Sequence, residues 1–110
     1  MIDSLISKLI DFRNERDWEQ FHNPKDLAIA LSIEANELME LFLWKDQKEV
    51  GEVDINKVKE ELADVFAFAL LLLEKYDLNL EEIVTEKIIS NAAKYPVDKA
   101  KGKATKYKDL

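Results

Sequence analysis

The sequence predicts an all-α protein with one domain built as a four-helix bundle. Only two glycines and two prolines interrupt the 110 residues, and apolar residues recur three or four positions apart over long stretches. That spacing places them on one face of a helix. With 47% hydrophobic and 35% charged residues, the chain can bury a core and still carry a charged surface. Disordered and collagenous classes are thereby excluded, and the length fits a single domain.

The first two helices follow from their capping residues. We expect one helix over residues 4–16, with Asp3 or Ser4 as its N-cap. A second helix begins after Asn23, because asparagine caps a helix well and the proline that follows suits the first helical position. Its apolar periodicity continues to about residue 45.

The other two helices lie beyond a polar connection at residues 46–54. The third is expected over residues 55–76. Asn79, with Glu82 three positions later, resembles a capping box and opens a fourth helix that ends before Pro96. Within the third helix, residues 65–73 are apolar on every side, so we expect this helix to be covered all round, in a dimer at least.

Composition and charge exclude several classes of function. The net charge of −7 and the pI near 4.8 argue against general affinity for nucleic acid or for anionic membranes. The absence of cysteine excludes disulfides, thiol catalysis and thiolate metal sites, and makes the cytoplasm the default compartment. The first residues lack the pattern of a signal peptide, and the longest apolar run has nine residues where a membrane span needs about 20.

Four carboxylates occupy positions where a helical core requires apolar side chains. Glu34 falls in the middle of the apolar stripe of the second helix, and Glu37 lies one turn later on the same side. Glu61 and Asp64 repeat the pattern in the third helix, on the side that carries Phe68. A short connection makes the two helices antiparallel neighbours, so the two pairs should meet.

Such a cluster calls for a metal ion. Buried like charges destabilise a fold unless cations neutralise them, and oxygen ligands favour Mg²⁺ or Mn²⁺. A di-iron bundle would need Glu-x-x-His pairs, but the only histidine, His22, precedes the second helix. The alternative is that these carboxylates lie on a broad, solvated face.

A cationic face is predicted on the fourth helix, where Lys87, Asn91 and Lys94 follow helical spacing. Lysines opposite an acidic metal cluster could hold a phosphate chain, although a solvated lysine face is the common alternative. The last fourteen residues, 97–110, hold five lysines and two aspartates and form a basic arm. Without further context, such an arm would be a frayed terminus.

The carboxylate motifs and their surroundings resemble a known family. Glu34-Ala-Asn-Glu37 followed by Glu61-Leu-Ala-Asp64 is similar to the ExxE…ExxD signature of the MazG-like all-α nucleoside triphosphate pyrophosphohydrolases. The segments RDWEQFH at 16–22, ELMELFLWK at 37–45, KYP at 94–96 and KYKDL at 106–110 resemble the branch of that family that acts on dCTP. The resemblance covers nearly the whole chain.

The resemblance implies a Mg²⁺-dependent hydrolase that converts a nucleoside triphosphate to the monophosphate and pyrophosphate. Residues 1–96 would form the catalytic domain of a dimer or tetramer, and the arm at 97–110 would contribute to the nucleotide site. The four carboxylates match metal ligands, and Glu37 is also a candidate general base. The residues that match phosphate-binding positions are Lys87, Asn91, Lys94, Lys106 and Tyr107.

The resemblance also implies a base-binding pair, Trp18 and Trp44, shared across a subunit interface with His22 as a nearby polar contact. Phe68 replaces a tyrosine expected in the family; its apolar ring would pack on the sugar and favour deoxynucleotides. dCTP is the favoured substrate, and dATP is the next candidate. The alternatives are a dUTPase, an enzyme for damaged nucleotides, or a non-catalytic helical protein that binds a partner.

Overall fold

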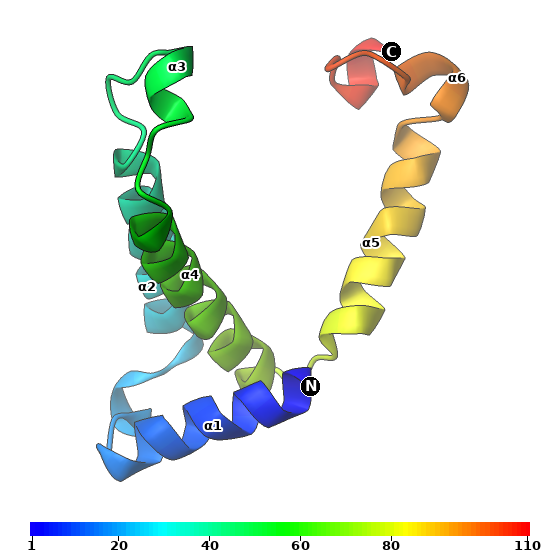
Figure 1. Ribbon diagram of the computed structural model, residues 1–110. Helices are drawn as coiled ribbons and strands as arrows, with labels where there is room; N and C mark the ends of the chain where they lie inside the picture. The colour runs from blue at the N-terminus through cyan, green and yellow to red at the C-terminus, as the bar shows by residue number, and fades with distance from the viewer. The chain divides into compact units, whose positions relative to one another are not determined.

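The computed structural model describes residues 1–110, and all of its regular structure is helical (Figure 1). The predicted all-α class and the four long helices are confirmed. The long helices are α1 (Ile2–Glu15), α2 (Pro24–Glu40), α4 (Ile55–Lys75) and α5 (Leu80–Lys94). The short ones are η1 (Glu19–Phe21), α3 (Gln47–Val50), α6 (Val97–Ala100) and η2 (Tyr107–Asp109). None is long and apolar enough to cross a bilayer.

Helix starts follow the predicted caps in two of three cases. The Asn23 side chain accepts a hydrogen bond from the Asp26 backbone N–H at 2.8 Å, and Asn79 accepts one from the Glu82 N–H at 2.9 Å. The prediction for α1 was wrong, because that helix begins at Ile2 and its N-cap is Met1. Asp3 instead lies in the first turn, where its charge is favourable beside the free backbone N–H groups.

The second helix ends at Glu40, earlier than predicted. The residues that follow form turns, and Trp44 has a φ of 60°, a left-handed conformation that a continuing helix cannot contain. The predicted connection then contains α3, which Asp46 and Glu49 open with a capping box. The Asp-x-x-Glu signal for this short helix was present in the sequence.

Backbone contacts divide the chain into two units, residues 1–77 and residues 78–110. In the first unit, α2 and α4 run antiparallel and pack along each other, and α1 packs against α4 (Figure 1). The most buried apolar side chains of this unit are Leu27 of α2 and Leu70, Leu71 and Leu73 of α4. The packed helices α2 and α4 therefore carry the four carboxylates of the predicted metal site.

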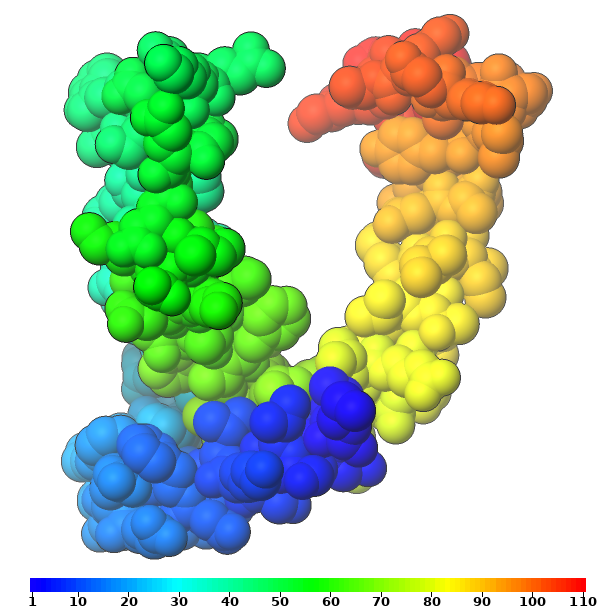
Figure 2. Space-filling view, in the orientation of Figure 1, coloured from blue at the N-terminus to red at the C-terminus, as the bar shows by residue number.

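The second unit contains α5 and the basic arm at 97–110, which includes α6 and η2. The arm folds against the end of α5, as the space-filling view shows (Figure 2). The ring of Tyr107 meets that of Tyr95 edge to face, with 6.0 Å between centroids, and Lys94 Nζ lies 4.9 Å from the Tyr107 centroid. These aromatic and cation–π contacts hold the arm beside Lys94.

Candidate functional site

The acidic cluster lies between α2 and α4. Glu34 of α2 and Glu61 and Asp64 of α4 each place a carboxylate oxygen within 4.8 Å of the other two. Glu34 and Glu61 are half-buried, whereas Asp64 is exposed. The antiparallel packing of the two helices thus brings three of the four predicted metal ligands together.

The fourth predicted ligand, Glu37, is close enough to affect the titration of its neighbours. Burial, hydrogen bonding with the Glu37 carboxyl and repulsion from the other carboxylates raise the pKa of Glu34 to about 7. The same three causes, again led by burial, raise the pKa of Glu61. Near neutral pH, the cluster therefore holds a proton that it would not hold if its members were apart.

The cluster has the chemistry of a site for a hard divalent cation. Oε2 of Glu34 and Oε2 of Glu61 are buried and have no hydrogen-bond partner, and both side chains lie close to other carboxylates. A cation would satisfy both oxygens and remove the repulsion. Carboxylate oxygens without sulfur or imidazole donors suit Mg²⁺ and Mn²⁺. The residues present fit such an ion.

An aromatic cavity of about 390 Å³ opens beside the cluster. Glu34 and Asp64 line one part of it, and Trp18, His22 and Phe68 line another. The rings of His22 and Phe68 meet edge to face at 6.4 Å. Three of the four residues predicted to contact the base and sugar therefore share a cavity with two of the predicted metal ligands.

His22 is a polar residue next to the aromatic side chains that line the cavity. Its Nδ1 is buried and has no hydrogen-bond partner. Burial, and after it the charges of Arg13 and Lys75, lower the pKa of His22, so the ring is neutral at pH 7. A neutral imidazole can either donate or accept a hydrogen bond, depending on its tautomer.

Trp44, the remaining predicted aromatic, does not line this cavity. It follows the end of α2 and is 91% exposed. Its indole ring is therefore free to contact another molecule, and within one chain it does not face Trp18 across the cavity.

The predicted phosphate-binding residues all lie in the second unit. Lys87, Asn91 and Lys94 are exposed on α5, at the predicted helical spacing. Lys106 and Tyr107 belong to the arm, and Tyr107 contacts Lys94 as described above. These five residues therefore belong to one compact unit, in which the arm reaches the end of the cationic face.

The sequence interpretation missed Arg13, which also lines the aromatic cavity. It is 3% exposed and is the buried charged residue of the chain. A signal was available, because Arg13 falls one turn after Leu9 on the apolar side of α1. Like Glu34, Arg13 is therefore a charged residue within the apolar stripe of its helix.

Comparison with known proteins agrees with the geometry. Residues 29–110 match the model of the MazG-like family. Proteins named dCTP pyrophosphatase 1 are similar over 105 residues, at 40% identity in Mus musculus and 37% in Homo sapiens. Each alignment covers 91% of this chain, and the chain spans 62% of the length of these relatives.

A solved structure is also similar. The crystal structure of a pyrophosphatase from Archaeoglobus fulgidus superposes with a TM-score of 0.82 at 39% sequence identity, over 86% of this chain and 91% of that one. The family match includes α4, α5 and most of α2, and thus all four carboxylates of the predicted motifs. On these grounds, the chain belongs to the MazG-like family.

Proposed function

We propose that this protein is a divalent-metal-dependent nucleoside triphosphate pyrophosphohydrolase that converts a deoxynucleoside triphosphate, preferably dCTP, to the monophosphate and pyrophosphate. The observation that carries the proposal is the aromatic cavity whose wall includes two carboxylates of an acidic cluster. A flat base fits between aromatic groups, and the triphosphate requires cations nearby. The names of the relatives, dCTP pyrophosphatase 1 and a pyrophosphatase, support the same reaction.

Glu34, Glu37, Glu61 and Asp64 would hold Mg²⁺, and Mn²⁺ suits the same oxygens. When bound, the ion supplies positive charge that offsets the phosphate oxygens and makes nearby water more acidic. Repulsion among the four carboxylates favours the binding of a cation.

Hydrolysis at the α-phosphorus requires a base and a leaving group. A water oxygen bonds to the α-phosphorus as the bond to the bridging oxygen of the β-phosphate breaks, and pyrophosphate leaves with that oxygen. Glu37 is the candidate acceptor for the proton of the water, because it is half-buried and close enough to raise the pKa of Glu34 and of Glu61. It serves either as this base or as a further ligand.

The phosphate chain would be held by Lys87, Asn91, Lys94, Lys106 and Tyr107. Lysine ammonium groups offset charge on the β- and γ-phosphates, and the contact between Lys94 and Tyr107 places the arm beside this face. In this arrangement, residues 1–96 form the catalytic domain and residues 97–110 add a basic arm that reaches the nucleotide.

The base would stack on Trp18, with His22 as its polar contact and Phe68 against the sugar. Trp44 would complete the base site from a second copy of the chain, which explains why so large an apolar ring is exposed at the end of α2. Exposed apolar side chains on α2 and α4, among them Ile29, Ile33 and Phe66, support assembly into a dimer at least and a tetramer by family resemblance.

The test is release of pyrophosphate from a panel of ribo- and deoxynucleoside triphosphates, with and without Mg²⁺. We expect metal-dependent release that is fastest with dCTP, and dATP next. Fastest release from dUTP or from a damaged nucleotide would support the same reaction with a different substrate. Absence of hydrolysis with every nucleotide would contradict the proposal and favour a non-catalytic helical protein that binds a partner through its acidic face.

A further inference from the structure

We propose that Arg13 is a positioning residue for base recognition, which holds the segment 18–22 against α4. The proposal rests on the proposed function, because Trp18 and His22 of this segment are the residues placed at the base. Arg13 itself lines the same cavity.

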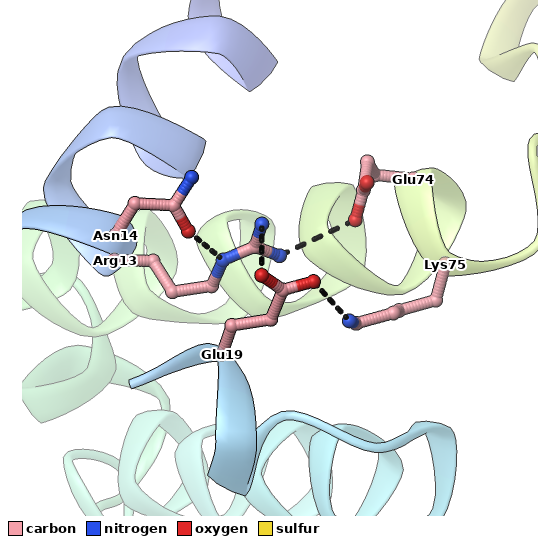
Figure 3. Close-up of polar contacts among 5 residues, drawn as sticks. All are labelled: Arg13, Asn14, Glu19, Glu74 and Lys75. Atoms are coloured by element: carbon pink, nitrogen blue, oxygen red, sulfur yellow. Dashed lines mark hydrogen bonds and ion pairs between the residues drawn. The ribbon is translucent and has the colours of Figure 1, made fainter. Parts of the chain in front are cut away.

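The guanidinium of Arg13 joins three separate elements (Figure 3). Its Nη1 donates a hydrogen bond to Glu74 Oε2 of α4 at 3.4 Å, and its Nη2 lies 3.8 Å from Glu19 Oε2 of η1. Lys75 of α4 donates to the other oxygen of Glu19, also at 3.4 Å. Glu19 is thus held from two sides, by α1 and by α4.

These contacts leave Arg13 with little capacity to bind a ligand directly. Its Nε donates to Asn14 Oδ1 at 3.1 Å, and both terminal nitrogens face carboxylates. A buried charge is costly unless it is paired, and here the pairing is with protein groups. The planar fork of arginine suits such a junction better than the single ammonium of lysine.

The segment that Arg13 holds follows a tight turn at the end of α1, and its other contacts with α4 come from Glu19 with Lys75 and from His22 with Phe68. Asp17 has a φ of 56°, a left-handed turn after α1, and the Trp18 N–H then donates to the Arg13 carbonyl at 3.0 Å. Glu19 lies between Trp18 and His22 in the chain. Its ion pairs therefore fix the short stretch of backbone that carries both cavity residues.

Loss of the junction should affect binding and leave the chemical step intact. A mobile segment must be ordered each time a nucleotide binds, which weakens binding. The metal-binding carboxylates are mounted on α2 and α4 and are not part of the junction. We therefore expect KM to rise while kcat is kept.

The experiment compares Arg13→Met, Arg13→Lys and the control Lys8→Met, which removes a positive charge from an exposed position of the same helix. With dCTP and Mg²⁺, Arg13→Met should raise KM on the order of tenfold with kcat within about twofold of wild type. Arg13→Lys should recover part of the loss because it keeps the charge, and Lys8→Met should behave as wild type. A fall in kcat with KM unchanged would overturn the proposal.

A second readout needs no substrate. In a Trp44→Phe background, where Trp18 is the only indole, Arg13→Met should increase acrylamide quenching of Trp18 fluorescence, and Lys8→Met should not. Unchanged quenching would overturn the positioning role even if the enzyme is active. If wild type hydrolyses no nucleotide, the proposed function fails, and quenching still decides the role of Arg13. Should Arg13→Met not fold, Glu19→Gln removes the carboxylate that Arg13 and Lys75 share, and it must give the same KM and quenching changes.

Discussion

Glu34 of α2 and Glu61 of α4 bring carboxylate oxygens within 4.8 Å of each other, and each keeps a buried Oε2 that accepts no hydrogen bond. The two helices form the main packing of the first unit, so this repulsion lies within the contact that holds the unit together. A divalent cation between the carboxylates would convert a destabilising contact into a stabilising one.

Neutralising any one of the four carboxylates should abolish hydrolysis and leave the protein folded. We expect Glu34→Gln, Glu37→Gln, Glu61→Gln and Asp64→Asn each to lower metal-dependent kcat/KM at least about a hundredfold. The thermal midpoint without metal should stay the same or rise, because a repulsive charge is lost. Glu40→Gln, at an exposed position of α2, is the matched control. Full activity in two or more of the four variants would contradict the metal assignment.

The raised pKa of Glu34 predicts how stability depends on pH. Its pKa is about 7 in the folded chain and near 4.5 when unfolded, so the folded state holds a proton over this range that the unfolded state has released. Without metal, this group therefore makes the protein less stable as the pH rises from 4.5 through 7. Thermal melts from pH 5.5 to 8 should show the decline, and Glu34→Gln should flatten it.

Mg²⁺ competes with that proton, so the increase in melting temperature caused by Mg²⁺ should be larger at pH 8 than at pH 5.5. An equal increase at both pH values in wild type would contradict the link between the proton and the metal.

The two tryptophans are predicted to govern nucleotide binding. Stacking contributes roughly 1 to 3 kcal/mol per contact, so Trp18→Ala and Trp44→Ala should each raise KM for dCTP between about 5-fold and 150-fold. The matched variants Trp18→Phe and Trp44→Phe should retain most of the affinity because phenylalanine also stacks. The prediction is wrong if both alanine variants keep the wild-type KM in steady-state kinetics.

Phe68 is predicted to set the preference for deoxyribose. Its ring lines the cavity beside His22 and offers no hydrogen bond to a 2′-hydroxyl, which would lose its water on binding. Wild type should therefore have a higher kcat/KM for dCTP than for CTP. Phe68→Tyr should bring the two kcat/KM values closer together. Equal kcat/KM for CTP and dCTP in wild type would refute this account of sugar selection.

Assembly is predicted to be obligatory, with Trp18 and Trp44 contributed to one site by different subunits. Sedimentation should show a dimer or tetramer at micromolar concentration. A stable, active monomer would refute the prediction of obligatory assembly. Co-refolding Trp18→Ala with Trp44→Ala supplies a sharper check. If two-fold symmetric dimers mix at random, about a quarter of the sites regain both tryptophans, so activity should recover to that extent. If activity does not recover, Trp18 and Trp44 of the same chain contribute to one site.

Much of the fold could be predicted because helix signals are local. Asn23 and Asn79 cap helices as expected, since a capping side chain bonds to a backbone N–H only three residues away. The end of α2 could not be predicted, because the apolar periodicity continues past the point where Trp44 takes up a left-handed backbone. The short helix α3 was predictable from Asp46 and Glu49 and was overlooked.

The sequence by itself determined which residues are the candidates for the chemistry. Helical periodicity alone identifies Glu34, Glu37, Glu61 and Asp64 as charges in apolar stripes, because each residue advances by a constant angle around its helix. Only the tertiary structure decided which side chains share a cavity. Trp18, His22 and Phe68 meet Glu34 there, and Arg13 joins α1, η1 and α4, because the folded backbone brings segments up to 61 residues apart into contact. Such contacts depend on how elements pack against one another, and no periodicity within a single helix encodes them.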